Sequence, residues 1–119
     1  MALVTLSEIL KPARDNHYCV AAFDTSNNDM TLAILETAEA LRSPVILMAL
    51  CVDIEGDKME YWLDGARKMA SRASVPVCLH LDTPPTRRLS RRLLTAGLPL
   101  SCTMDLFCPL QKMLKTQSR

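Results

Sequence analysis

The chain has 119 residues, 49% of them hydrophobic and 23% charged, and its formal net charge is +1. That length suits one domain and excludes two, and the apolar content excludes a disordered chain. No apolar run approaches the roughly 18 residues of a membrane span, and no basic stretch leads into an apolar one at the start. Five cysteines without C-x-x-C spacing are interpreted as core residues in a reducing compartment, so we expect a cytoplasmic protein without membrane contact.

The charge is distributed unevenly along the chain. Residues 1–82 carry seven Lys/Arg against twelve Asp/Glu, a net charge of −5, whereas residues 83–119 carry seven basic residues against one acid, a net charge of +6. Four of the seven prolines also fall in this shorter second part. Such a change of composition predicts a boundary near residue 82. We therefore divide the chain into residues 1–82 and a basic tail, residues 83–119.

The first predicted element is a short helix. Thr5-Leu-Ser-Glu8 has the spacing of a capping box, and Val4 and Ile9 are placed as its hydrophobic staple. Pro12 is expected to end or kink this helix early, because proline lacks the N–H that a helix interior uses.

Three apolar runs follow, at residues 18–23, 44–50 and 76–81. They are near-continuous and not alternating, which predicts parallel strands buried on both faces. Helical patterns separate them: one is capped by Asn27, Asn28 or Asp29, and the other covers residues 58–73. The apolar stripe of the first contains Met30, Ala33, Ile34, Ala38 and Leu41, and that of the second Met59, Trp62, Leu63, Ala66, Met69 and Ala73.

This order of elements fits either a doubly wound α/β domain or the opening of a (β/α)₈ barrel. The first strand is not followed by a glycine-rich loop, which argues against a dinucleotide-binding or P-loop fold. Two strands end in an acid, Asp24 and Asp82, at the end of the sheet where such folds carry reactive residues. Helix capping is the competing interpretation, and it is weaker for Asp82, which no clear helix start follows.

Three segments together resemble the opening of the class II fructose- and tagatose-bisphosphate aldolases: VTLSEILKPARDNHYCVAAFDTSNNDM, LAILETAEALRSPVILMA and ASVPVCLHLD. The resemblance implies the first three β/α units of a truncated (β/α)₈ TIM barrel. It also implies a homo-oligomeric parent enzyme that reversibly cleaves a ketose 1,6-bisphosphate to dihydroxyacetone phosphate and an aldehyde. In that family a divalent metal, usually zinc, is held by histidines and polarises the substrate carbonyl.

The resemblance also assigns roles to single residues. Asp82 matches the family's aspartate that relays a proton to the aldehyde oxygen, so it is the catalytic candidate. His80 matches the first histidine of the same segment but is interpreted as a core residue. Thr83 stands where the family has a metal-binding histidine, and His17 is the chain's other histidine. Asp24, where asparagine is usual, is a substrate-contact candidate. We therefore expect no zinc binding and no turnover by this chain.

Residues 83–119 are interpreted as the product of an aldolase gene that is translated in a shifted reading frame after Asp82. Asp-His encoded GAC CAC becomes Asp-Thr on loss of one base, and regrouped codons for residues 97–105 can encode FTSVMYDG, which resembles the family. A kinase-like Arg87-Arg-Leu-Ser90 motif and the surrounding arginines are then accidental, and the tail has no fold of its own. Two alternatives stay open: a non-catalytic α/β interaction module whose basic tail contacts nucleic acid, and a small intact α/β protein whose tail packs as a helix.

Overall fold

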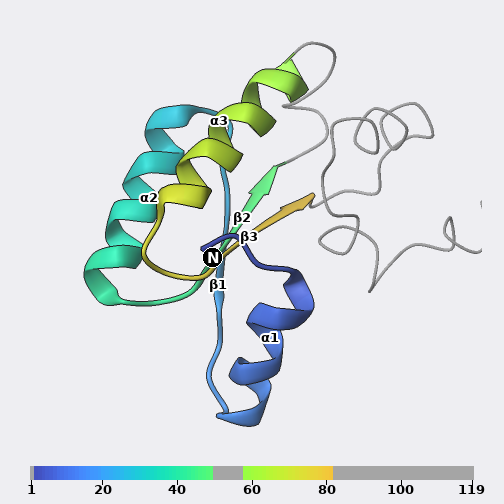
Figure 1. The fold of residues 1–119 in the computed structure, drawn as a ribbon, viewed down its shortest axis with the longest axis vertical. Helices are drawn as coiled ribbons and strands as arrows, with labels where there is room; N and C mark the ends of the chain where they lie inside the picture. Colours follow the sequence, from blue (N-terminus) through green and yellow to red (C-terminus); the bar gives the residue numbers. More distant parts are fainter. Residues whose placement is uncertain (1, 50–57, 82–119) are drawn as a thin grey trace, which may run out of the picture.

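The computed structural model describes residues 2–49 and 58–81, which form a parallel three-stranded sheet with helices on both faces (Figure 1). The elements in chain order are α1 (Leu6–Asp15), β1 (Ala21–Asp24), α2 (Asn28–Leu41), β2 (Val45–Ala49), α3 (Lys58–Arg72) and β3 (Val77–Leu81). This confirms the predicted order of helices and strands. The predictions for the basic tail fall outside the described residues.

The strands lie in the order β1-β2-β3, with β2 in the centre. Burial follows from this position: β2 is buried at four of its five residues, whereas all four residues of β1 are exposed. The prediction of burial on both faces therefore holds for β2 and is wrong for β1. Within the described residues, β1 pairs with β2 alone and forms an edge of the sheet.

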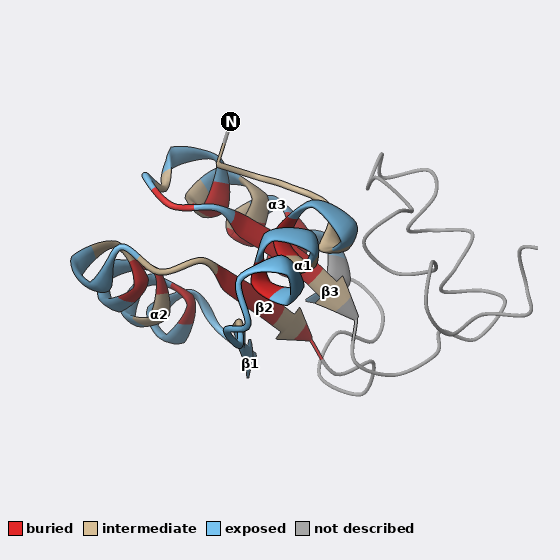
Figure 2. Cartoon of the chain, turned by 90° about the horizontal axis from the view of Figure 1, so that it is seen from below, coloured by how far each residue is buried: buried red, intermediate tan, exposed pale blue. Residues whose placement is uncertain are grey.

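The two faces of the sheet pack against different helices. On one face Val45, Leu47 and Leu79 form the main core with α2 and α3. On the other, Ile46 and Cys78 pack against Ile9 of α1. Successive strand residues point to opposite faces, so an uninterrupted apolar run supplies both cores. Figure 2 shows the buried positions gathered on β2, β3 and the helix sides that face them.

The start of α1 has the predicted capping box. The Thr5 hydroxyl accepts a hydrogen bond from the Glu8 backbone N–H at 3.2 Å, and the Glu8 carboxylate accepts one from the Thr5 N–H at 2.7 Å. Val4 and Ile9 lie in the same apolar cluster, which confirms the staple. Of the two outcomes predicted for Pro12, the early end of the helix is wrong, because α1 continues through it to Asp15, and the kink stays a prediction. An interior proline removes one donor, and here the last turn is closed by Asn16, whose backbone and side-chain N–H groups donate to the Pro12 carbonyl at 3.0 and 2.9 Å.

Removing this cap gives a first testable prediction. We expect Thr5→Ala to lower the free energy of unfolding by about 1 kcal/mol. Hydrogen bonds from the Thr5 N–H and hydroxyl lower the pKa of the Glu8 carboxyl below its usual 4.5. A lowered folded-state pKa stabilises the fold above the unfolded-state value, and this stabilisation is lost as the pH falls through the folded-state value. Thr5→Ala keeps the backbone N–H at position 5 and removes only the hydroxyl's share of this effect, so the difference between wild type and Thr5→Ala should shrink in part below pH 4.5.

The measurement is urea unfolding followed by the fluorescence of Trp62, the chain's single tryptophan. Ser7→Ala, an exposed substitution in the same turn, is the matched control and should leave the pH dependence unchanged. A Thr5→Ala deficit that stays constant down to pH 3 would contradict this account of Glu8.

The other two helices follow their sequence patterns to different degrees. Asn27 caps α2, its side-chain oxygen accepting from the Met30 N–H at 2.9 Å. The predicted stripe of α2 is partly wrong, since Met30, Ala33 and Leu41 are exposed. The residues of α2 that are buried are Thr31, Leu35 and Ala38, with Ile34 packed beside them. The stripe of α3 is confirmed at Trp62, Leu63, Ala66, Met69 and Ala73. The structure does not describe the side chain of Met59, so its place in the core stays a prediction.

Candidate functional site

A row of three residues crosses the carboxyl ends of the strands. The strand register pairs Asp24 of β1 with Met48 of β2, and Met48 with His80 of β3. Met48 packs with Ile46 and Cys78 on the sheet face turned away from α2 and α3. Because paired residues in neighbouring strands point to the same face, Asp24 and His80 share that face. We call Asp24, Met48 and His80 the carboxyl-end row.

The row separates its two polar members by two strand spacings of roughly 4.8 Å, so their Cα atoms lie about 10 Å apart. Asp24 is exposed and His80 is partly buried. The capping interpretation of Asp24 is wrong, since the N-cap of α2 is Asn27. Asp24 is thus an exposed carboxylate at the end of a parallel strand, available as a hydrogen-bond acceptor. Asp82 follows the last residue of β3 in sequence but lies outside the described residues.

A buried hydrogen bond that was not predicted supports this end of the sheet. The Trp62 indole N–H donates to the Thr25 hydroxyl at 3.1 Å, and both residues are buried. The Thr25 backbone N–H in turn donates to the Met48 carbonyl at 2.8 Å, which extends the β1–β2 pairing past Asp24. The sequence identified Trp62 only as a core residue. The available signal was that a tryptophan on a buried stripe needs a partner for its N–H group.

This pair gives a second prediction. Thr25→Val keeps the shape of the side chain but leaves the Trp62 N–H buried without its acceptor, so we expect a loss of about 1–3 kcal/mol in the free energy of unfolding. The matched control is Thr37→Val on the exposed side of α2, whose hydroxyl donates to the Ala33 carbonyl at 2.7 Å. Urea unfolding followed by circular dichroism compares the two variants. Equal losses would show that the Trp62–Thr25 bond has no special role.

The described residues do not form the zinc site that the resemblance implies for the parent family. In residues 2–49 and 58–81, no three His, Cys, Asp or Glu side chains come together. His17 lies between α1 and β1, before the amino end of the sheet, whereas His80 lies near its carboxyl end. The two histidines therefore do not converge, and Thr83, which the resemblance places at a family histidine position, is outside the described residues.

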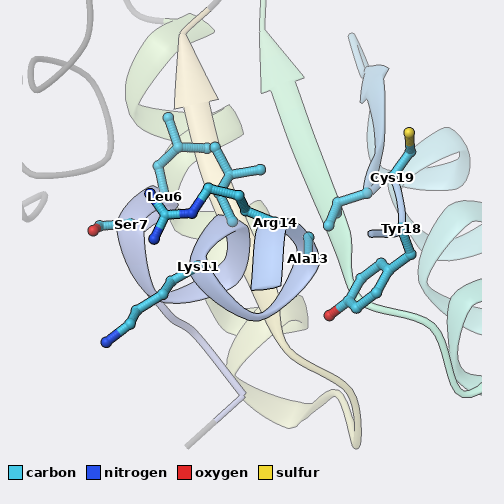
Figure 3. Close-up of a pocket in the computed structure, with 9 residues that line it drawn as sticks. Leu6, Ser7, Lys11, Ala13, Arg14, Tyr18 and Cys19 are labelled. Carbon is cyan, nitrogen blue, oxygen red and sulfur yellow. The ribbon is translucent and has the colours of Figure 1, made fainter. Parts of the chain in front are cut away.

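A separate groove of about 780 Å³ runs between α1 and the segment that leads into β1 (Figure 3). Leu6, Leu10 and Val20 contribute apolar walls, and Lys11 and Arg14 contribute positive charge. Arg14 forms an exposed ion pair with its neighbour Asp15 at 3.3 Å. Because residues 18–20 precede β1, this groove lies toward the amino end of the strands, away from the carboxyl-end row.

In the described part of the chain, no helix has the length and apolar character needed to cross a membrane.

Comparison with known proteins matches most of the chain to one family. The family model "Fructose-bisphosphate aldolase class-II" matches residues 4–104. The match starts just before the capping box of α1 and includes all six described elements. It also continues past Asp82, farther than the boundary predicted from composition.

Individual relatives agree with this match. The chain is 33% identical over 106 residues to 6-phospho-5-dehydro-2-deoxy-D-gluconate aldolase of Bacillus licheniformis, covering 82% of this chain and 34% of that protein. It is 44% identical over 84 residues to the fructose-bisphosphate aldolase of Thermus caldophilus, covering 67% and 26%. The crystal structure of the YdjI aldolase from Escherichia coli K12 superposes with a TM-score of 0.72 at 26% identity, covering 81% and 38%.

The chain thus spans between 26% and 38% of the length of these three relatives. Its parallel β1-β2-β3 sheet with α2 and α3 on one face corresponds to part of an aldolase TIM barrel. Sequence, fold and structural similarity all agree: the chain belongs to the class II fructose-bisphosphate aldolase family.

Proposed function

We propose that this chain is the amino-terminal part of a class II ketose-bisphosphate aldolase and that the 119-residue polypeptide does not itself catalyse aldol cleavage. The parent reaction is the reversible cleavage of a ketose 1,6-bisphosphate to dihydroxyacetone phosphate and an aldehyde. The observation that carries the proposal is the histidine content: the chain has His17 and His80 alone, at opposite ends of the sheet, and Thr83 where the family has a ligand. We propose a cytoplasmic location on the basis of the cysteine pattern, and a homo-oligomeric parent enzyme.

Within the parent enzyme, Asp82 is the proposed proton relay to the aldehyde oxygen. It directly follows β3, whose carboxyl end borders the carboxyl-end row. Asp24 is the proposed substrate contact, since its exposed carboxylate shares the sheet face of His80 and can accept hydrogen bonds from sugar hydroxyls. Zinc, when bound by the parent enzyme, supplies Lewis-acid polarisation of the substrate carbonyl.

The test is an assay of the purified 119-residue chain with added zinc. Fructose 1,6-bisphosphate and 6-phospho-5-dehydro-2-deoxy-D-gluconate are the substrates to use, because the relatives include aldolases named for each. We expect product formation no faster than in buffer, with the Thermus caldophilus enzyme as the positive control. Turnover that disappears on addition of a chelator would overturn the proposal.

We further propose that residues 83–119 are encoded out of frame. Thr83 at the histidine position and the change in charge after Asp82 support this proposal, whereas the family match that continues to residue 104 weighs against it. Sequencing the genomic DNA onward from the codon for Asp82 decides whether the tail is encoded in frame or out of frame. An additional base that restores Asp-His and a continuing aldolase frame is the expected result. A downstream region without aldolase sequence in any frame would exclude the frameshift.

A further inference from the structure

The turn that follows Asp24 is held from the α3 side of the sheet. Trp62 of α3 donates its indole N–H to the Thr25 hydroxyl at 3.1 Å, and this hydroxyl donates to the Met48 carbonyl at 3.4 Å. The Thr25 backbone N–H donates to the same carbonyl at 2.8 Å. Trp62 and Thr25 are only 7% and 2% exposed, so water does not replace these partners unless the structure opens.

A second contact joins the same turn to α3. Gly65 lies three residues after Trp62, and a Cβ atom added to it would be 2.8 Å from Asn28 Oδ1. Residues three apart lie on one side of a helix, so Trp62 and Gly65 present neighbouring positions to the turn. Glycine at position 65 allows the first residue of α2 to lie directly against α3. Both ends of the segment 25–28 therefore contact the same side of α3.

These contacts determine which way Asp24 faces. All four residues of β1 are exposed, so burial of its side chains contributes little to its register with β2. Thr25, the next residue, is buried and bonded to Trp62 on the α3 side. Successive residues of a strand point to opposite faces, so Asp24 is turned to the face of Met48 and His80. A slip of one residue would turn Asp24 away from the carboxyl-end row.

We propose that Trp62 is a positioning residue, which acts through Thr25 to hold Asp24 in the carboxyl-end row. Trp62 belongs to the core on the α2 and α3 side of the sheet, whereas Met48 of the row packs on the other side. Trp62 therefore acts on the site without touching a substrate. Its role rests on the proposed function of Asp24 as a substrate contact and adds the group that fixes this carboxylate in place.

The test is backbone amide hydrogen exchange of the full 119-residue chain, measured by NMR without substrate or zinc. The Thr25 amide reports on the turn. The Val45 amide, which donates to the Pro76 carbonyl at 3.1 Å near the amino end of β2, reports on the sheet. Trp62→Phe keeps an aromatic ring in the core and removes the N–H donor. We expect it to lower the protection of Thr25 about tenfold more than that of Val45. The Asp24 Cα and Cβ chemical shifts should also move away from strand values.

Two substitutions at Thr25 separate the hydroxyl from the shape of the side chain. Thr25→Ser keeps the acceptor and should retain the wild-type difference between the two amides, whereas Thr25→Val should reproduce the effect of Trp62→Phe. Leu63→Val is the matched control, since Leu63 is the next residue of α3, is buried in the same core and has no polar side-chain group. It should lower the protection of Val45 at least as much as that of Thr25.

Equal losses of protection at Thr25 and Val45 in Trp62→Phe would overturn the proposal, because Trp62 would then stabilise the whole sheet and not the turn. So would an unprotected Thr25 amide in the wild-type chain, or a Thr25→Ser variant that behaves as Thr25→Val does. None of these measurements involves turnover. Their failure is therefore distinct from the detection of activity in the zinc assay, which would overturn the proposed function instead.

Discussion

Leu47→Ala is expected to remove most of the cooperative structure of the chain. Leu47 is at the centre of β2, paired with Phe23 on one side and Leu79 on the other, and its side chain is fully buried against α2 and α3. Truncating a buried leucine typically costs about 2–5 kcal/mol, because the transfer free energy is lost and a cavity remains. The free energy of unfolding of a small domain is about 5–15 kcal/mol. Because this sheet has an open, exposed edge strand, we expect the free energy of unfolding of this chain to be at or below about 5 kcal/mol.

Leu41→Ala is the matched control for this substitution. It removes the same atoms from a leucine that is 72% exposed, so we expect a change within about 0.5 kcal/mol. Far-UV circular dichroism during heating and Trp62 fluorescence in urea should both show a much lower midpoint for Leu47→Ala alone. Similar midpoints for the two variants would mean that the core in the described residues does not determine the stability of the chain.

Interactions between close neighbours in sequence were the most predictable part of the fold. Thr5 and Glu8 are three residues apart, as are Asn27 and Met30, and both helix starts are found where side-chain chemistry indicated. An early end of the helix at Pro12 was predicted by the same local logic and was wrong, because the last turn of α1 is held by Asn16 and Ala13 next to the proline is buried. Local rules give the cost of a proline but not the tertiary contacts that compensate for it.

Features that depend on the arrangement of elements were less predictable. Which side of α2 is buried depends on where the sheet and α3 lie, so periodicity alone placed Met30 and Leu41 in the core, where they are not. The Trp62–Thr25 bond joins residues 37 positions apart, and no sequence spacing indicates it. Asp24 was a candidate from its place after a strand. Its alignment with His80 across Met48 required the strand register, which the apolar runs do not specify.

The largest effect on activity is expected in a chimera that joins residues 1–82 of this chain to the Thermus caldophilus aldolase in place of the corresponding segment. At 44% identity over the match, most packing positions of the barrel should be filled by similar side chains. With histidine at position 83, the chimera should bind zinc and cleave fructose 1,6-bisphosphate. Threonine, as in this chain, would remove the nitrogen ligand that the resemblance implies at position 83, and a hydroxyl does not replace it, so we expect activity to fall by about three orders of magnitude or more.

Zinc content measured on the purified proteins separates the two explanations of a low rate. A chimera with threonine at position 83 that is folded but poor in zinc would place its defect in metal binding, as the substitution predicts. Asp82 is the proposed proton relay, and an amide cannot relay a proton as a carboxyl group does, so Asp82→Asn in the histidine chimera should keep the zinc and lose about two to four orders of magnitude in rate. If the threonine chimera bound zinc and turned over as fast as its histidine counterpart, position 83 would not be a ligand.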